Sequence, residues 1–424
     1  MIAGGGHPNP LLHAPAPSIR PILDGSTSKA NGQRSCSASE TLRRIAAFFA
    51  GYGITRIANV TGLDRIGIPV CMAVRPNSRG LAVSQGKGLD LDAAKVSAAV
   101  ESIEGWHAER PLCTQTLERY SDLSARAAAA DPHGLAISRN SAFAPNRTIP
   151  WAEATDLQTG VSVWVPFELV HADATLPRMP GSGCFVFSTN GLASGNGLAE
   201  ATLHALCELI ERDAIALWKV SGGEACTETR IDPDSVEDGA CRELLHRYRA
   251  AGIMPMLWDV SSDIGLPVFR VLIYDEWAGA SLTPYATAFG AGCHPSREVA
   301  LSRALTEAAQ SRLTAIAGSR DDGTRGHFEA TQGSAAAEYY GALAKRPASL
   351  RFDQSPSANH RTLEADLRHA IHCLAARGMT QVLNVDLTRP DSPVAVVRCI
   401  VPGLEGPSSS PSYAPGRRAR AVTG

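Results

Sequence analysis

A long apolar helix that carries a stripe of acidic residues is the feature that most constrains this chain. Residues Gly181 to Val220 predict a short strand at Cys184 to Phe187, a turn rich in Ser, Asn and Gly, and then a helix from about Leu198. The helix is apolar almost all round, which is typical of a buried helix. Spacings of 4, 4 and 3 residues nevertheless place four polar side chains on one face: Glu200, His204, Glu208 and Glu211. Buried carboxylates are unfavourable unless a cation compensates them, so the stripe favours a divalent metal.

The same 4-and-3 spacing recurs in two further predicted helices. The first, Asp92 to about Arg110, and the second, Pro295 to Ala317, carry these stripes: Ser97, Glu101 and Glu104; Arg303, Glu307 and Gln310. A solvated polar face is the simplest explanation of any one stripe, but these are narrow and lie among small or apolar residues. Several facing carboxylates would repel one another without Mg²⁺, which binds carboxylates together with substrate phosphates. The pattern therefore predicts three related helices that converge on a metal–nucleotide site.

Three cationic residues are candidates for contacts to phosphate. Lys87 lies in the glycine-flanked loop predicted at 84–88, where an ordinary exposed lysine is the alternative. Arg212 follows Glu211 directly and so points about 100° away from the carboxylate stripe, where it could reach a phosphate or pair with Asp213. Arg312 is the third. Asn196 precedes the central helix, and a capping role and a ligand contact are compatible there. The fingerprints of P-loop and dinucleotide-binding proteins are not matched.

Composition narrows the classes of protein that this chain can represent. Of its 424 residues, 44% are hydrophobic and 19% charged, and the net charge is −2, so no basic field for nucleic acid is expected. No apolar run approaches the ~20 residues needed to span a membrane. The ten cysteines form no C-x-x-C pair, so neither a zinc ribbon nor a thioredoxin motif is indicated. With no signal peptide at the N-terminus, a reducing cytoplasm is the simplest setting.

Predicted strands and helices are mixed without strict alternation, which indicates an α+β or mixed α/β fold and not a doubly wound sheet. We expect a helix at 118–130, in addition to those above. Residues 1–38 are rich in Gly, Pro, Ser and Asn and are predicted to form a disordered tail. Residues 39–424 are predicted to form a single domain with sub-lobes at 39–180 and 181–424 and a tail rich in Pro, Gly and Arg from 402.

Several long motifs, in order along the chain, resemble the YcaO family. They cover about residues 40 to 420: SQGKG (84–88), KVSAAVESIEGWHAE (95–109), STNGLASGNGLAEATLHALCELIERDA (188–214) and GAGCHPSREVALSRALTEAAQSRL (290–313). The flanking runs TGLDRIGIPV and IVPGLEG are similar to the subgroup encoded beside TfuA-type partner proteins.

This resemblance implies a YcaO-type fold that binds ATP between carboxylate-bearing helices, with Mg²⁺ held by the carboxylates. Family members phosphorylate a backbone amide oxygen of a peptide and form an azoline or, with sulfide, a thioamide; they often form homodimers. The TfuA-associated subgroup is linked to thioamidation of precursor peptides or proteins. The ending PGRRARAVTG lacks the Pro-x-Pro-x-Pro tail of many azoline-forming members, which favours the thioamide. The alternatives are an azoline-forming cyclodehydratase and a non-enzymatic accessory factor for ribosomal-protein methylthiolation.

The resemblance also implies roles for individual residues. Catalytic roles fall to Glu208, Glu211 and Arg212. Mg²⁺ is assigned to Glu101, Glu104, Glu208 and Glu211. Nucleotide contacts are assigned to Lys87, Ser97, Glu101, Asn196, Glu200, Gln310 and Arg312, with Glu200 shared between metal and nucleotide. Gly105 stands where the family motif ends in arginine, which removes one charge partner. The roles of His204 and Arg398 stay open between the site and packing or a structural ion pair.

Overall fold

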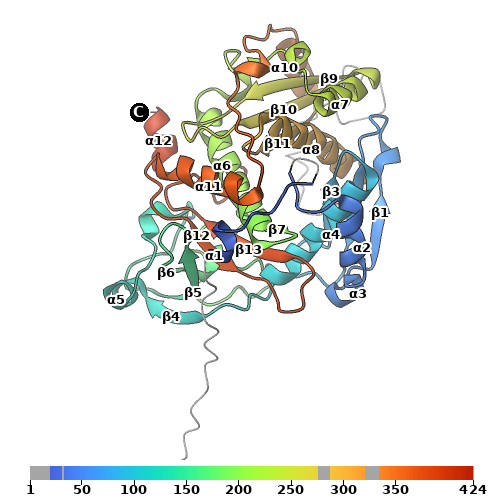
Figure 1. Ribbon diagram of the computed structural model, residues 1–424. Helices are drawn as coiled ribbons and strands as arrows, with labels where there is room; N and C mark the ends of the chain where they lie inside the picture. The colour runs from blue at the N-terminus through green and yellow to red at the C-terminus, as the bar shows by residue number, and fades with distance from the viewer. Residues whose placement is uncertain (1–19, 31–32, 276–286, 320–333, 424) are drawn as a thin grey trace, which may run out of the picture.

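Three antiparallel sheets organise the chain, and a long helix packs on each of them (Figure 1). The computed structural model describes residues 20–30, 33–275, 287–319 and 334–423. The first sheet has the order β1-β2-β3. Its strands are β1 (Arg56–Asn59), β2 (Val70–Val74) and β3 (Val83–Lys87). The second has the order β11-β10-β9-β8. Its strands are β8 (Arg230–Ile231), β9 (Ile253–Asp259), β10 (Val268–Asp275) and β11 (Thr287–Cys293).

The third sheet joins strands that are far apart in the sequence. Its order is β4-β5-β12-β13-β7, and β6 also pairs with β5. The strands are β4 (Gln115–Arg119), β5 (Thr148–Asp156), β6 (Ser162–Pro166), β7 (Leu192–Gly195), β12 (Leu383–Asp386) and β13 (Ala395–Ile400). This mixture of antiparallel sheets and helices confirms the predicted fold class.

The helices cover the sheets, and the longest of them, α6, lies near the middle of the molecule and contacts α1, α11 and α12 (Figure 1). In chain order they are α1 (Arg20–Leu23), α2 (Ala38–Ala46), α3 (Phe49–Tyr52), α4 (Leu91–Ala108), α5 (Tyr120–Arg126), α6 (Leu198–Val220), α7 (Gly239–Ala250), α8 (Arg297–Ala317), α10 (Ser334–Ala344), α11 (Leu363–Ala375) and α12 (Arg417–Thr423). None of these helices, nor any other in the described residues, has the length and apolar character needed to cross a membrane.

Four of the sequence predictions fail at the level of local structure. The glycine-flanked loop at 84–88 belongs mostly to strand β3, and part of the predicted turn after Phe187 is strand β7. In the predicted strand at Cys184–Phe187, Phe185 forms only an isolated bridge to Ile137. The helix predicted at 118–130 shrinks to α5, because residues 115–119 pair with β5 as strand β4. For β4 and β7, pairing with a strand far away in the sequence overrides local propensity.

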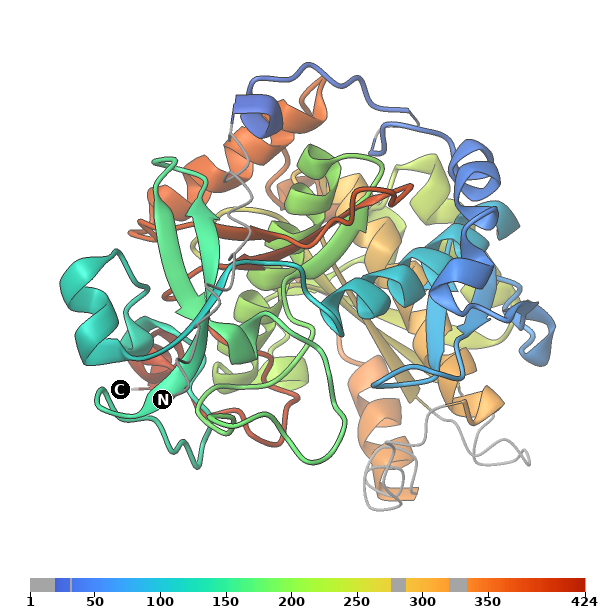
Figure 2. The same ribbon diagram turned by 90° about the horizontal axis from the view of Figure 1, so that it is seen from below.

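The N-terminal segment crosses the face of the domain on which α11 and α6 begin (Figure 2). Ile22 is buried in the central core. The Thr27 backbone N–H and hydroxyl donate to Glu364 at 2.8 and 2.6 Å, and Lys29 forms an ion pair with the buried Asp366. Residues 20–30 and 33–38 are therefore packed against the domain, contrary to the predicted disordered tail. Residues 1–19 of that tail lie outside the described residues.

The C-terminal segment is fastened to α6. Arg418 donates from Nε and Nη2 to the buried Asp213 at 2.9 and 3.1 Å. Asp213 also accepts the Glu405 N–H at 2.9 Å. Asp213 is thus occupied by the C-terminal segment and does not pair with Arg212.

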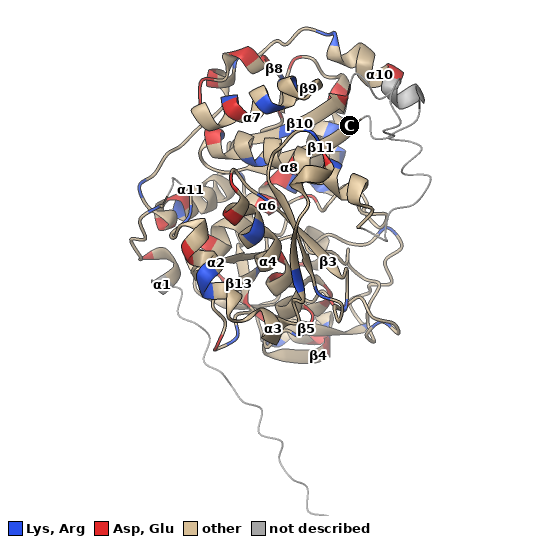
Figure 3. Cartoon of the chain, turned by 90° about the vertical axis from the view of Figure 1, so that its right-hand side faces the viewer, with Lys and Arg blue, Asp and Glu red and all other residues tan. Residues whose placement is uncertain are grey.

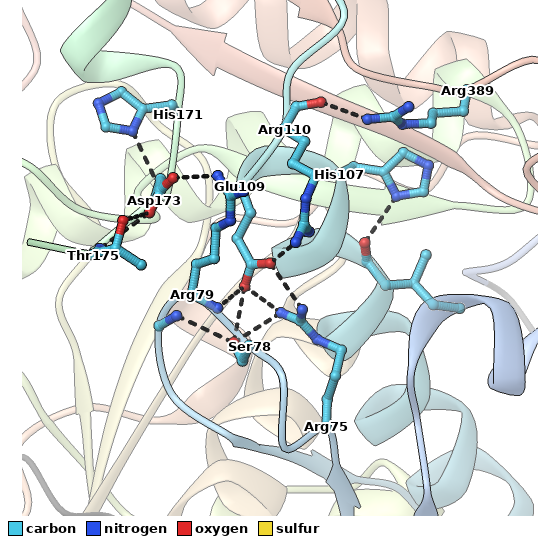
Figure 4. A network of polar contacts seen from close by, with 12 residues as sticks. Arg75, Ser78, Arg79, His107, Glu109, Arg110, His171, Asp173, Thr175 and Arg389 are labelled. Atoms are coloured by element: carbon cyan, nitrogen blue, oxygen red, sulfur yellow. Dashed lines mark hydrogen bonds and ion pairs between the residues drawn. The ribbon is translucent and has the colours of Figure 1, made fainter. Parts of the chain in front are cut away.

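A buried polar network holds the C-terminal end of α4 (Figure 4). Glu109 accepts from Arg75 Nη1 and Nη2 at 2.8 and 2.5 Å and from the Arg79 N–H at 2.9 Å. A Cβ atom at Gly105 would lie 3.3 Å from Arg75 Nη2. The space beside Gly105 is therefore bordered by the guanidinium of Arg75, which follows β2 and ties α4 to the first sheet.

Candidate functional site

Three strand–helix units form the framework of the site. Helices α4, α6 and α8 each pack on the strand that comes before them, which is β3, β7 and β11 respectively. Each helix also contacts the strand of another unit: α4 meets β7, α6 meets β11 and α8 meets β3. These contacts close the three units into a ring. The convergence predicted from the repeated polar stripe is therefore present in the fold.

Glycines let each strand touch its helix. A Cβ atom at Gly86 would lie 2.0 Å from the Ala98 backbone nitrogen, and one at Gly290 would lie 2.1 Å from the Ala304 carbonyl oxygen. At Gly195 a Cβ would lie 2.5 Å from the Ala201 backbone nitrogen. Only a residue without a side chain allows backbones to come this close. Each strand is thus near enough to its helix to bond polar side chains on it.

One glutamate of each helix accepts a backbone N–H from the strand of its own unit. The Gln85 N–H donates to Glu101 at 3.3 Å, and the Ala291 N–H donates to Glu307 at 3.3 Å. Glu208 accepts the N–H of Gly191, directly before β7. Glu104 is bound across units, because it accepts the Ser194 N–H and hydroxyl at 2.8 and 2.6 Å. These bonds fix the carboxylates in one region of the ring.

The neighbouring carboxyl groups of the three helices form a carboxylate cluster: Glu101, Glu104, Glu208, Glu211 and Glu307. Within this cluster, neighbouring carboxylates disfavour one another's ionisation. Burial raises the pKa of Glu104 to about 8, and the nearby Glu101 and Glu208 charges add to the rise. Burial, followed by repulsion from Glu307, raises the pKa of Glu211 to about 7. Burial likewise raises the pKa of Glu208. Carboxyl groups that resist ionisation in this way are stabilised as carboxylates when a cation binds beside them, so the site is suited to a cation.

Cationic side chains border the same cluster. Lys87 Nζ lies 2.5 Å from Glu307 Oε2. Burial would raise the pKa of Glu307, but Lys87 and Arg212 outweigh it and lower that pKa. Arg212 interacts with Glu208, Glu211 and Glu307, although its Nε lies 4.0 Å from the nearest oxygen of Glu211. Figure 3 shows the two charge types side by side on α6 and α8. The site therefore offers carboxylates for a metal and cations for phosphate.

Glu200 does not join this cluster as the structure stands. It is only 4% exposed and accepts from Arg34 Nη1 at 3.1 Å and from the Ser35 N–H and hydroxyl at 3.0 and 2.7 Å. The Asn196 amide donates to it at 3.1 Å. Asn196 in turn accepts from Thr41 at 2.9 Å and from Arg44. The predicted nucleotide residues Glu200 and Asn196 are thus bound to the N-terminal segment and α2.

The contact between Ser35 and Glu200 is expected to stabilise the fold measurably. Ser35→Ala should lower the free energy of unfolding by about 1–2 kcal/mol, because it removes a hydroxyl donor from a buried carboxylate. Burial would raise the pKa of Glu200, but Arg34, Ser35 and Asn196 together lower it. A lowered pKa stabilises the fold above the pKa of an unfolded glutamate, and this stabilisation is lost as the pH falls through the folded value. The free energy of unfolding, measured with urea, should therefore differ less between the wild-type protein and Ser35→Ala in acid than at pH 7.

Ser39→Ala is the matched control, because Ser39 is exposed and lies only four residues away. It should leave the stability unchanged. Equal effects of the two substitutions would contradict the assigned role of Ser35.

Arg312 lies outside the cluster, contrary to its predicted contact with the nucleotide. It is 1% exposed, and its Nε and Nη2 donate to Asp64 and Asp275 at 2.9 and 3.0 Å. On α8 it lies five residues beyond Glu307, which turns it by about 140° away from that carboxylate. We assign Arg312 to a buried structural ion pair.

Ser97 and Gln310 lie on the cluster faces of α4 and α8, since they are four and three residues from Glu101 and Glu307. Both side chains are partly buried. His204 is neutral, because burial and then the nearby Arg303, Arg34 and Lys87 lower its pKa well below the ordinary value. Its Nδ1 is buried and has no hydrogen-bond partner among the described residues.

Sequence reasoning did not select Glu307 as a ligand, although the structure places it inside the cluster. The signal was available, because Glu307 occupies the stripe position that corresponds to Glu101 and Glu208. The sequence also did not indicate that Arg270 reaches the site. Burial lowers the pKa of Arg270, whereas the nearby charges of Glu307, Glu224 and Glu211 act to raise it. Its position on β10 gave no sign in the sequence that it would reach this region.

The carboxylates suit a metal ion whose remaining coordination positions are filled by a second ligand. Within the parts of the chain that the structure describes, no group of three or more His, Cys, Asp or Glu side chains is arranged to hold a metal ion. Mg²⁺ in nucleotide sites takes one or two carboxylates together with phosphate oxygens and water. Glu104, Glu208 and Glu211, with Lys87 and Arg212 beside them, meet that requirement without a complete protein cage.

Comparison with known proteins identifies this framework. The family described as a YcaO cyclodehydratase that binds ATP and Mg²⁺ matches residues 85–405. The expected ATP and Mg²⁺ are therefore the ligands of the matched family. A protein of Rhizobium leguminosarum bv. trifolii, named "Uncharacterized protein in tfuA 3'region", is 40% identical over 379 residues, covering 88% of each chain. A protein of Methanothermobacter thermautotrophicus is 34% identical over 389 residues, which cover 90% of this chain and 97% of the other.

Two solved structures have a similar fold. The YcaO protein of Methanopyrus kandleri, bound with AMPPCP and Mg²⁺, is 23% identical with a TM-score of 0.70, covering 90% of this chain and 94% of the other. A heterocyclase in complex with substrate and cofactor is 19% identical with a TM-score of 0.73. The match covers 90% of this chain but only 54% of that heterocyclase. At these identities the likeness concerns the fold alone.

Proposed function

This chain belongs to the YcaO family, and on that premise we propose that it activates a peptide backbone amide by phosphorylating the amide oxygen with ATP. The proposed product is a thioamide in a ribosomally made peptide or protein, formed together with a TfuA-type partner. The observation that carries the proposal is the meeting of buried carboxylates with Lys87 and Arg212 in one ring of helices. In such a site the carboxylates can hold the metal ion, and the cationic side chains can neutralise the charge of the polyphosphate bound to it.

The proposed ligands are those that the family resemblance implies, and the meeting of α4, α6 and α8 in one ring supports them. Mg²⁺ is assigned to Glu101, Glu104, Glu208 and Glu211, and it would neutralise charge on the transferring phosphoryl group. The phosphates are assigned to Lys87 and Arg212. Ser97, Asn196 and Gln310 remain predicted nucleotide contacts. Glu200 would join them only by exchanging its bonds to Arg34 and Ser35.

The chemistry solves the problem of a poor leaving group. Hydrosulfide attacks the amide carbon, and a carbon–sulfur bond forms while the carbonyl π electrons move to oxygen. That oxygen takes the γ-phosphoryl group, and the bond to the ADP oxygen breaks. The carbon–oxygen bond then breaks, phosphate leaves with the oxygen, and the sulfur proton ends on phosphate. Amide, hydrosulfide and ATP thus give thioamide, ADP and hydrogen phosphate with atoms and charge balanced.

Two findings support the thioamide over the azoline. The 40% identical relative is named by its position beside tfuA, which suggests the same partner for this chain. In addition, Arg418 ties the C-terminal segment to Asp213 in α6. That segment is engaged in a structural contact, whereas a catalytic tail would have to reach the carboxylate cluster.

Mass spectrometry of a reconstituted reaction tests the proposal. The protein, a TfuA-type partner, ATP, Mg²⁺, hydrosulfide and a precursor peptide encoded nearby are incubated together. We expect ADP release and a peptide whose mass rises by the difference between sulfur and oxygen.

Other products identify the alternatives. Loss of one water from the peptide would indicate an azoline-forming cyclodehydratase. A lack of any peptide-dependent ADP release would favour an accessory role, such as support of ribosomal-protein methylthiolation, and would contradict the proposal.

A further inference from the structure

A small cavity lies between α6, β13 and the turn that precedes β7. Its volume is about 50 Å³. The lining is mainly apolar, with Leu135, Leu169, Val186 and Leu209 among its walls, and it includes Arg398 and Asn190. A single water needs about 10–15 Å³ on the same measure, so the cavity has room for a few heavy atoms. A ligand of a few atoms fills this volume.

Arg398 is a buried cation with unused donors at this cavity. Its residue is 1% exposed, and its Nη2 donates to the Ser188 carbonyl at 2.7 Å. Its Nε and Nη1 are buried and have no hydrogen-bond partner among the described residues. Burial lowers the pKa of Arg398 to about 10, which leaves it charged at neutral pH. A buried guanidinium with two free donors is costly unless an acceptor binds there.

Asn190 supplies a hydrogen-bond acceptor to the same cavity. Its side-chain oxygen is buried and accepts no hydrogen bond from the described residues. The one carboxylate in the lining, Glu405, is already engaged: it accepts from the Tyr413 hydroxyl at 2.8 Å and from the Gly416 and Ala419 N–H groups at 2.7 and 2.8 Å. A single ligand that accepts hydrogen bonds from Arg398 and donates one to Asn190 would therefore satisfy both polar groups of the cavity.

Neighbouring residues of the chain line the cavity and form the carboxylate cluster. Leu209 lines the cavity, and its chain neighbour Glu208 belongs to the cluster. Asn190 lines the cavity, and its neighbour Gly191 donates its N–H to Glu208. Arg398 is also one of the cations that act electrostatically on Glu208. A molecule held beside Arg398 would thus lie next to the place where the amide is activated.

We propose that this cavity binds the hydrosulfide anion, with its sulfur accepting from Arg398 and its hydrogen donated to Asn190. The inference rests on the proposed thioamidation, for which it supplies the binding site of the sulfur nucleophile. Hydrosulfide has the charge, the size and the single hydrogen that the polar groups require, whereas chloride has no hydrogen to donate. Its diffuse charge also suits an apolar lining better than that of hydroxide does. When a metal neutralises Glu208, the attraction of Arg398 for an anion increases.

Arg398→Met tests the proposal in the reconstituted reaction, with sodium hydrosulfide as the sulfur source. The substitution removes the charge and the donors but keeps an unbranched chain, and replacing a buried charge by an apolar group of similar size is commonly tolerated. We expect the half-saturating hydrosulfide concentration to rise by about 10- to 100-fold, as for loss of hydrogen bonds to a charged group. The half-saturating concentrations of ATP and peptide should not change. Arg398→Lys should restore part of the loss.

Arg389→Met is the matched control. Arg389 also has a buried Nε without a partner among the described residues, but it stacks over Trp106 and bonds the Arg110 carbonyl at 2.8 Å. It should leave the hydrosulfide dependence unchanged. A rise in the half-saturating peptide or ATP concentration in Arg398→Met, with an unchanged hydrosulfide dependence, would overturn the proposal.

Binding can also be measured without catalysis. Crystals soaked anaerobically with hydroselenide should show an anomalous scattering peak between Arg398 and Asn190 in the wild-type protein and none in Arg398→Met. No peak in the wild-type crystals would overturn the site, even if the enzyme makes thioamide. A peak in an enzyme that makes no thioamide would uphold the anion site and refute the proposed function. The two failures are therefore distinguishable.

Discussion

Glu208→Gln is expected to abolish ATP-dependent turnover while the protein stays folded. Glu208 accepts the Gly191 N–H, and its charge acts on Glu104, Glu211 and Arg398. Without this carboxylate the proposed metal loses a ligand, and turnover should fall by about 10³-fold or more. The fold should not suffer, because the amide keeps an acceptor for Gly191 and relieves repulsion within the cluster.

Thermal unfolding separates loss of the site from loss of the fold. A ligand present at 100 times its Kd stabilises a protein by about 2.7 kcal/mol, so Mg²⁺ with a non-hydrolysable ATP analogue should raise the Tm of the wild-type protein. The Glu208→Gln variant should have an unchanged or higher Tm without ligand and no ligand-induced rise. Glu243→Gln on α7 is the matched control, because Glu243 is 58% exposed and forms an ion pair with Arg247. Retained turnover in Glu208→Gln would remove α6 from the metal site.

The long helices are the part of the fold that the sequence predicts best. The helix predicted to begin near Leu198 begins there, and the helix predicted at Pro295–Ala317 is α8, Arg297–Ala317. Helical periodicity is a local property, and these helices bury small and apolar residues in a regular pattern. The spacing of their polar residues is also sufficient to predict that Glu104, Glu208 and Glu211 lie in one region.

The strands that build the site could not be predicted in the same way. Strands β3 and β7 contain Gly86 and Gly195, and glycine disfavours strands on local grounds. Their glycines are explained by the helix that lies against each strand, which is information about tertiary structure. Similarly, nothing in the local sequence indicates that Arg34 and Ser35 reach Glu200, 166 and 165 residues away.

The partners of the cationic side chains could not be predicted from the sequence either. Arg212 points away from the stripe of α6 by its helical position, yet its charge acts on Glu208 and Glu211 and also on Glu307 of α8. Arg312 belongs to a matching motif, but Asp64 and Asp275 from other elements engage it. A motif gives the residue type at a position, whereas the partners of a long side chain depend on which elements pack around it.

Gly290→Ala is expected to destabilise the protein strongly and to disorganise the site. A Cβ atom at Gly290 would lie 2.1 Å from the Ala304 carbonyl oxygen and 2.4 Å from the Ala308 backbone nitrogen. Both contacts are with the backbone of α8, so no side chain can move aside, and β11 must shift away from the helix. The next residue, Ala291, donates its N–H to Glu307, and this bond would be lost with the shift. Overpacking typically costs about 1–3 kcal/mol, and this clash between two backbones should lie at the upper end of that range.

Urea unfolding and the Tm rise with Mg²⁺ and the ATP analogue should measure both effects. In Gly290→Ala the midpoint of unfolding should fall, and the folded fraction should bind the nucleotide more weakly because Glu307 and Lys87 are displaced together. Gly51→Ala in α3 is the matched control, since a Cβ there meets nothing within 4 Å. It should be neutral or stabilise the helix by up to about 1 kcal/mol. Wild-type stability in Gly290→Ala would contradict the view that glycine-mediated contact between strand and helix holds the carboxylates in place, since a backbone clash on this scale cannot be absorbed while β11 keeps its position on α8.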